Sequence, residues 1–211
     1  MPPTLLNKLN PIPEKLTHTG RVSAILLAGG TSSRMGTDKR TILLEQKTLA
    51  EIARDKLESL SSDILISAGD DLPEFRGYRR IPDREAGEGP LGGIISCIPY
   101  CRHEQMIVLS CDMPLIPPSL LEELLQQFRT PATLPVHRQQ VQPLCGIYHK
   151  DLLPHLDQQY KKGVRKLRDA LEDTGTIHLS TERLSLPVKD HWFLNINRPE
   201  DLREAEHYFR D

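Results

Sequence analysis

The sequence lacks the features of membrane-spanning, nucleic-acid-binding and secreted proteins. No apolar run approaches the ~20 residues that a helix needs to span a bilayer. The formal net charge is −2 at pH 7, so neither nucleic acid nor a membrane surface is an expected partner. Residues 1–20 contain prolines but no basic start and no continuous apolar core, which predicts an extended tail rather than a secretory signal.

Cysteine is scarce, and its spacing does not indicate a metal site. No two cysteines are separated by the two residues of a zinc knuckle, and an enzyme of the cytoplasm would keep them reduced. We therefore expect four buried core thiols, at Cys97, Cys101, Cys111 and Cys145. Five histidines also lack ligand spacing and are expected to be ordinary surface or core residues: His137, His149, His155, His178 and His191.

Two common phosphate-binding motifs are absent as well. The chain contains no P-loop and no dinucleotide-binding fingerprint. The apolar run Val22 to Leu27 leads instead into a loop over residues 28–39, with the sequence AGGTSSRMGTDK. Paired glycines allow the backbone to approach a ligand closely, and successive N–H groups in such a turn bind anions. With Arg34 and Lys39 as further donors, the loop predicts a polyphosphate site.

Strands and helices alternate along the first 130 residues and become less regular afterwards. Apolar runs predict strands at 22–27, 64–68, 78–81 and 106–109, and helical spacing predicts helices at 49–60, 90–101 and 117–128. Later strands are predicted at 142–148 and 192–196, and later helices at 152–160, 164–171 and from Pro199. This alternation predicts one α/β domain over residues 21–211, a mostly parallel Rossmann-like sheet with helices on both faces and ligands at the carboxyl ends of its strands.

Five sequence blocks together carry a resemblance to a known family. The first runs from Leu27 to Lys39 and includes an Asp before the Lys. The later blocks are Ile81-Pro82-Asp83 with 89–94, then 108–114, 142–148 and 195–202. In content and order, the five blocks resemble the molybdenum cofactor guanylyltransferase family, and the first resembles its opening signature. One departure is Gly69, which stands where the family commonly has an asparagine that contacts the nucleotide. The resemblance implies the nucleotide-diphospho-sugar transferase type of fold, with a nucleotide half at about 21–130 and an acceptor half at about 131–211.

The resemblance also implies roles for individual residues. The implied catalytic residues are Arg34, Lys39 and Asp112. The implied nucleotide-binding residues are Leu27, Ala28, Gly29, Lys39, Asp83 and Asp112. The implied acceptor-binding residues are Asn195 and Asn197, and Asp112 is the implied ligand of Mg²⁺, which takes carboxylate and phosphate oxygens. The ordinary alternatives are a surface lysine at 39, turn-forming acids at 83 and 112, and asparagines that bond only to their own turn.

The function that the resemblance implies is transfer of GMP from GTP to molybdopterin phosphate, with Mg²⁺ as cofactor. The products are molybdopterin guanine dinucleotide and pyrophosphate. Partners of such an enzyme include other proteins of molybdenum cofactor biosynthesis and molybdoenzyme chaperones. Two alternatives stay open on the residues: a nucleotidyltransferase that uses another nucleotide and another phosphorylated acceptor, and a GTP-binding regulator without catalysis.

Overall fold

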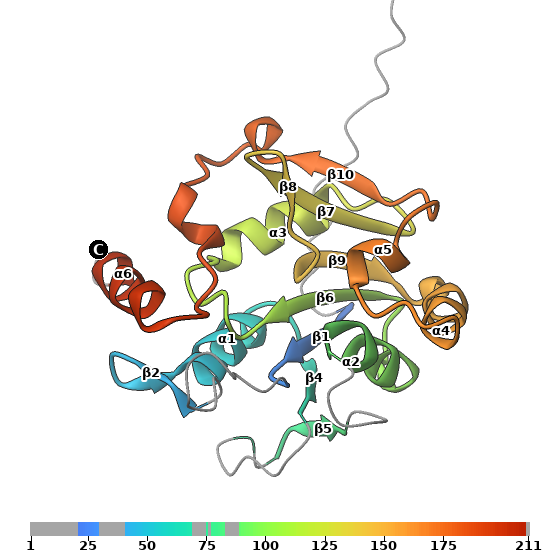
Figure 1. Ribbon diagram of the computed structural model, residues 1–211, viewed down its shortest axis with the longest axis horizontal. Coiled ribbons are helices and arrows are strands. Elements are labelled where there is room, and N and C mark those ends of the chain that lie inside the picture. Colours follow the sequence, from blue (N-terminus) through green and yellow to red (C-terminus); the bar gives the residue numbers. More distant parts are fainter. Residues whose placement is uncertain (1–20, 30–40, 69–74, 76, 83–88, 210–211) are drawn as a thin grey trace, which may run out of the picture.

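The computed structural model describes residues 21–29, 41–68, 75, 77–82 and 89–209 (Figure 1). Three predicted site residues, Arg34, Lys39 and Asp83, lie outside these ranges, as do Gly69 and the expected tail over residues 1–20. Their predicted roles therefore rest on the sequence.

An eight-stranded sheet forms the centre of the molecule, in the order β10-β7-β9-β6-β1-β4-β5, with β8 paired to β7 (Figure 1). Strand β9 runs antiparallel to both β6 and β7, so that β7 and β10 point the same way as β1, β4, β5 and β6. The carboxyl ends of these six strands therefore lie at one edge of the sheet, which we call the carboxyl edge. The strands are β1 (Val22–Leu27), β4 (Asp63–Ser67), β5 (Arg79–Ile81), β6 (Gln105–Ser110), β7 (Ala132–His137), β8 (Gln140–Val141), β9 (Cys145–His149) and β10 (Ile177–Ser180).

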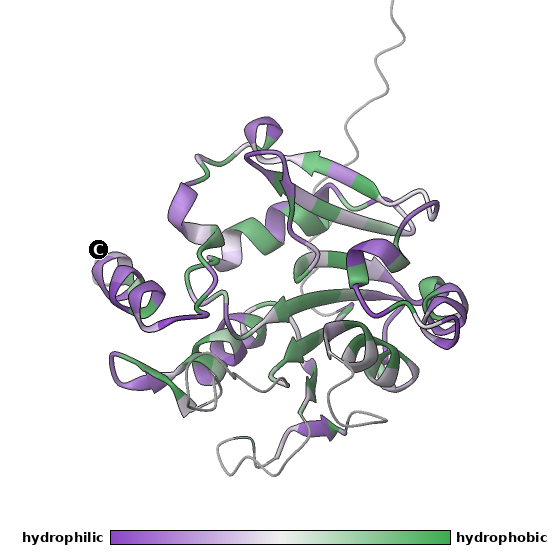
Figure 2. Cartoon of the chain, viewed as in Figure 1, coloured by the Kyte–Doolittle hydropathy of each residue, from purple (hydrophilic) through white to green (hydrophobic). Residues whose placement is uncertain are grey.

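Helices cover both faces of the sheet, because every residue of β1 and β4 is buried and needs an apolar partner on either side. Helices α1 (Leu49–Glu58) and α3 (Pro118–Gln126) pack on one face. Helices α2 (Gly89–Cys97), α4 (Leu153–Lys161) and α5 (Leu167–Ala170) pack on the other. Figure 2 shows the resulting pattern, in which apolar residues gather in the central strands and in the helix faces that cover them.

A third, smaller apolar cluster joins the C-terminal helix to the region of the site. It brings together Ile196, Leu115, helix α6 (Pro199–Phe209) and the hairpin of β2 (Leu43–Leu44) and β3 (Lys47–Thr48). The hairpin leads into α1 through a capping box, in which the Glu51 N–H donates to Thr48 Oγ1 (3.1 Å) and the Thr48 N–H donates to Glu51 Oε2 (2.8 Å).

The structure confirms the fold class, a mostly parallel sheet with helices on both faces, and corrects several elements. The strand predicted at 192–196 is wrong: residues 190–193 form a 3₁₀ helix, η6 (Asp190–Phe193). This segment lies beside the end of β6, and β6 is already paired on both sides, with β1 and β9. The helix predicted at 164–171 shrinks to α5, and the strand predicted at 142–148 begins at Cys145.

Five strands, β2, β3, β7, β8 and β10, were not predicted. Pro135 interrupts the β7 sequence, and proline removes a donor from the sheet, so the pattern did not read as a strand. All four cysteines are buried, as expected, and no disulfide joins any two of them. Among the described residues, none of the helices combines the length and the apolar character that a membrane-spanning segment requires.

Candidate active site

Backbone hydrogen bonds join the predicted nucleotide block to the ends of the neighbouring strands. At the end of β1, the Ala28 N–H donates to the carbonyl of Ser67 in β4 (3.0 Å). The carbonyl of Leu27 accepts from the Cys111 N–H just beyond β6 (3.1 Å). Leu27 and Ala28 are buried and Gly29 is exposed, so the chain leaves the core at the start of the glycine loop.

A second pair of hydrogen bonds brings the later blocks to the same place. The Ser110 N–H donates to the carbonyl of Leu144, at the start of β9 (2.9 Å). The carbonyl of Asp112 accepts from the Ile196 N–H (2.8 Å), although these residues are 84 positions apart (196 − 112). Asp112 therefore lies between the end of β1 and the segment that carries Asn195 and Asn197.

The two asparagines occupy half-buried positions on either side of Ile196. The Asn195 side-chain amide donates to the carbonyl of Phe193 (3.3 Å), and the Asn197 side-chain amide donates to the carbonyl of Asn195 (3.5 Å). Local bonding, the ordinary alternative, thus accounts for one amide proton of each residue. The acceptor role stays a prediction, with both residues placed next to the backbone of Asp112.

Gly93 allows α2 to pack directly on the ends of β1 and β4. A Cβ atom at this position would lie 2.3 Å from Ser67 Oγ, 3.2 Å from Ser67 Cβ and 3.3 Å from Leu27 Cδ2. Rotation of the Ser67 hydroxyl would relieve the first contact but not the second. The close approach of helix and strand ends therefore depends on a residue without a side chain.

We expect Gly93→Ala to lower the free energy of unfolding by about 1–3 kcal/mol, because overpacking forces the helix or the strand end to shift. Urea unfolding measures this loss. The matched control is Ser96→Ala in the same helix: the Ser96 hydroxyl is buried and has no hydrogen-bond partner among the described residues, so its removal should cost nothing. Equal unfolding midpoints for wild type and Gly93→Ala would contradict this packing.

Lys56 places a positive charge next to the turn that contains Asp112 and Pro114. This residue was not among the predicted site residues. Its Nζ donates to the carbonyl of Pro114, two residues after Asp112. Burial lowers the pKa of Lys56 to about 8, and the neighbouring Cys145 acts in the opposite direction. The signal that could have revealed it is spacing, because Lys56 stands at i+3 and i+4 from Ala53 and Ile52 on the apolar face of α1.

The lowered pKa predicts a pH dependence of stability that Lys56→Met should remove. Between the folded pKa of about 8 and the ordinary value of 10.5, the unfolded chain binds more protons than the folded chain. The free energy of unfolding should therefore rise with pH in this window. Between about pH 7 and about pH 10, the free energy of unfolding of wild type should rise by on the order of 2 kcal/mol relative to that of Lys56→Met. Urea unfolding of both proteins at both pH values measures this change. A stability difference between the two proteins that does not depend on pH would contradict the prediction.

A cavity of about 480 Å³ lies at the opposite, amino edge of the sheet and belongs to a structural ion-pair network. Asp63 there accepts from the Ser23 hydroxyl (2.6 Å), from Arg79 Nη1 (2.7 Å) and from the Arg102 backbone N–H (2.8 Å). Burial acts to raise the pKa of Asp63, but these donors hold it below its ordinary value. The network joins the starts of β1, β4 and β5 and is remote from the predicted site.

Comparisons with known proteins agree with the resemblance in sequence. The family described as the MobA-like NTP transferase domain matches residues 24–177. A probable molybdenum cofactor guanylyltransferase of Chloroflexus aggregans is 33% identical over 200 residues, covering 89% of this chain and 94% of the relative. The molybdenum cofactor guanylyltransferase of Pseudomonas putida is 32% identical over 188 residues, covering 86% and 96%.

A solved structure is also similar. The crystal structure of molybdopterin-guanine dinucleotide biosynthesis protein A from Archaeoglobus fulgidus superposes with a TM-score of 0.76 at 26% identity, covering 89% of this chain and 98% of the other. With a family match over most of the chain and relatives above 30% identity over nearly all of it, the predicted family is confirmed: this chain is a nucleotidyltransferase that belongs to the molybdenum cofactor guanylyltransferases, within the MobA-like NTP transferase family.

Proposed function

We propose that this protein works in the cytoplasm and transfers GMP from GTP to the phosphate of molybdopterin. The observation that carries the proposal is the meeting of four sequence blocks at the carboxyl edge, through the hydrogen bonds of Leu27, Ser110 and Asp112 with distant segments. The names of the relatives supply the substrates. We also propose the division into a nucleotide half at about 21–130 and an acceptor half at about 131–211.

In the proposed reaction, a phosphate oxygen of molybdopterin attacks the α-phosphorus of GTP, and the bond from that phosphorus to the bridging oxygen breaks to release pyrophosphate. Such transfers depend on positioning and charge neutralisation. Backbone groups of Leu27, Ala28 and Gly29 hold the nucleotide, while Arg34 and Lys39 neutralise its phosphates. A covalent intermediate on Cys145 is unfavourable, because burial raises the pKa of its thiol to about 12.

The residues present fit Mg²⁺ as the proposed cofactor. Within the described ranges, no group of three His, Cys, Asp or Glu side chains forms a metal site made of protein ligands only. Asp112 instead offers one carboxylate beside the nucleotide block, and Mg²⁺ is commonly held by one or two carboxylates together with substrate phosphates. When bound, the ion would neutralise phosphate charge. We propose Asp112 as its protein ligand and Asp83 as a further nucleotide contact.

The test of the proposed function is a comparison of nucleotides with molybdopterin present. GTP should give molybdopterin guanine dinucleotide and stoichiometric pyrophosphate, and ATP, CTP and UTP should give neither. Turnover with CTP or UTP would favour the alternative nucleotidyltransferase. Tight GTP binding without pyrophosphate release would favour the regulator. We further propose that the product is handed on to molybdoenzyme chaperones and that other proteins of cofactor biosynthesis deliver the pterin.

Lys39→Ala should weaken binding of GTP more than binding of GMP, because we place Lys39 at the β- or γ-phosphate. A lost charge-assisted hydrogen bond is worth ~1.5–3 kcal/mol, which corresponds to a loss of about tenfold or more in GTP affinity. Isothermal titration with both nucleotides measures this. Equal losses of affinity for GTP and GMP would show that Lys39 does not contact the β- or γ-phosphate.

A further inference from the structure

His137 links the central sheet to the segment that leads to the predicted acceptor residues. It ends β7 at the carboxyl edge, and only 13% of its side chain is exposed. Its Nε2 lies 3.0 Å from Asp190 Oδ1, and its Nδ1 lies 3.1 Å from Thr181 Oγ1. Its ring stacks on Phe193, with ring centroids 4.6 Å apart and planes 21° apart.

Both ends of η6 are therefore in contact with one imidazole ring. Asp190 begins this 3₁₀ helix and Phe193 ends it. Nδ1 and the Thr181 hydroxyl form a hydrogen bond whose donor depends on the ring tautomer, whereas Nε2 and Asp190 Oδ1 are in close contact without hydrogen-bond geometry. The ring thus contacts groups on two different segments, η6 and η5 (Thr181–Arg183).

The contacts of η6 continue to both asparagines. The Phe193 carbonyl accepts from the Asn195 amide, and the Asn195 carbonyl accepts from the Asn197 amide. Between them, the Ile196 N–H donates to the carbonyl of Asp112. His137 is therefore connected to both asparagines through Phe193: its ring stacks on Phe193 at 4.6 Å, and side-chain hydrogen bonds of 3.3 and 3.5 Å continue to Asn195 and Asn197.

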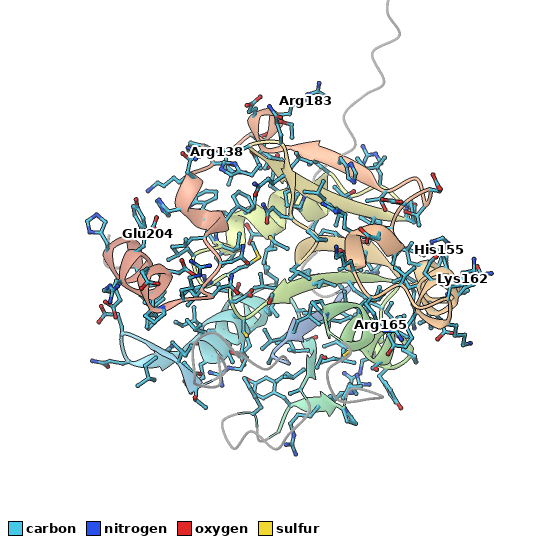
Figure 3. All side chains as sticks on the ribbon, in the orientation of Figure 1. Arg138, His155, Lys162, Arg165, Arg183 and Glu204 are labelled. Carbon is cyan, nitrogen blue, oxygen red and sulfur yellow. The ribbon has the colours of Figure 1, made fainter. Side chains whose placement is uncertain are left out.

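An open cavity of about 420 Å³ lies beside η6. Its lining includes His137, Arg138 and Asp190, together with Leu184, Leu186, Pro187 and Val188. Arg138 also pairs with Asp190, but it is exposed on the molecular surface at this edge (Figure 3). An exposed ion pair contributes little to stability. The largely buried His137 ring therefore makes the stronger contact between β7 and η6.

We propose that His137 is a positioning residue for acceptor binding: it fixes η6 and thereby the side-chain amides of Asn195 and Asn197. This inference rests on the proposed function, because it takes these two residues as the acceptor contacts. Two hydrogen-bonding groups held on a short segment bind a ligand well only when their geometry is fixed before binding. A loosened η6 should weaken acceptor binding and leave the nucleotide site unchanged.

The test compares His137→Phe with wild type. Phenylalanine keeps a ring that can stack on Phe193 but has neither nitrogen. The KM for molybdopterin should rise about tenfold, which corresponds to about 1.4 kcal/mol. The KM for GTP and the kcat should stay within about twofold, a difference of only about 0.4 kcal/mol. The controls are Arg138→Gln, which keeps the imidazole contacts, and His178→Gln, an exposed histidine of β10. Both should behave as wild type.

A second readout does not depend on activity. Trp192 is the only tryptophan of the chain and lies within η6, so its fluorescence reports on this segment. Quenching by acrylamide should increase in His137→Phe and remain unchanged in Arg138→Gln and His178→Gln. Increased quenching with the selective rise in KM supports the proposal. An unchanged Trp192 signal would overturn it.

A double-mutant cycle separates action through the asparagines from a merely structural effect. In an Asn195→Ala, Asn197→Ala background, His137→Phe should have little further effect on the KM for molybdopterin, since coupled residues are not additive. A full tenfold rise in that background would overturn the positioning role. Absence of product from wild type would overturn the proposed function instead, whereas an active wild type with an unchanged KM in His137→Phe overturns only the role of His137.

Discussion

Asp112→Ala should lose at least about a hundredfold in the rate of pyrophosphate release, which corresponds to about 2.7 kcal/mol in the activation free energy. The reason is the position of the carboxylate at the carboxyl edge, beside the nucleotide block and the asparagine segment. The fold should survive the change, because the contact from Ile196 is made to the backbone carbonyl of Asp112, which alanine keeps. Circular dichroism and urea unfolding check the fold.

Asp151→Ala is the matched control for this experiment. Asp151 is an exposed carboxylate whose side chain lies 3.2 Å from His149 Nδ1, so its removal should leave turnover unchanged. If Asp112→Ala keeps more than about a tenth of the wild-type rate with Mg²⁺, a loss below ~1.4 kcal/mol, then Asp112 is not the metal ligand. Its role would then be confined to the turn that joins β6 to α3.

Replacement of both Asn195 and Asn197 by alanine should harm acceptor binding and spare GTP binding. Each hydrogen bond lost to a charged acceptor is worth ~1.5–3 kcal/mol, so the double variant should lose on the order of a hundredfold or more in apparent affinity for molybdopterin. Titration with GTP should be nearly unchanged, because the contacts between β1 and the ends of β4 and β6 do not involve either side chain.

The double variant also tests the proposed division of the domain. Gln158→Ala removes an exposed carboxamide from α4 and should change neither titration. If GTP binding collapses in the double asparagine variant while molybdopterin binding survives, the acceptor site lies elsewhere and the two proposed halves are wrong. The unfolding midpoint should be measured as well, because both asparagines hydrogen-bond within their own turn.

The predicted elements were most accurate where the chain forms parallel strands joined by helices. The apolar runs at 22–27, 64–68 and 106–109 are buried strands, because a strand covered on both faces must be apolar along its whole length. The capping box at Thr48 and Glu51 was predictable for a local reason, since both of its hydrogen bonds lie within four residues. Capping residues close in sequence and uninterrupted apolar runs can both be recognised from the sequence alone.

The predictions failed where long-range contacts decide the structure. The segment 192–196 is apolar enough for a strand, but the neighbouring strand edges are occupied, so it forms η6 and a connection to Asp112. The antiparallel direction of β9 was equally hidden, because direction depends on which edge of the sheet is open when the chain returns. The same limit applies to His137, whose spacing shows no ligand pattern and whose contacts come from residues 44 to 56 positions away.

The order of residues was enough to predict the class of fold, the family and the residue types available for phosphate chemistry. These follow from burial along strands, from glycine and cation content in one loop, and from five blocks in a fixed order. Only the tertiary structure decided that Asp112 and Ile196 share a hydrogen bond, that Lys56 lies beneath the same loop, and that His137 contacts both ends of η6. These contacts join residues far apart in the sequence, so they depend on where the chain reverses and on the order of strands in the sheet. Neither can be predicted from the spacing of residues within one segment.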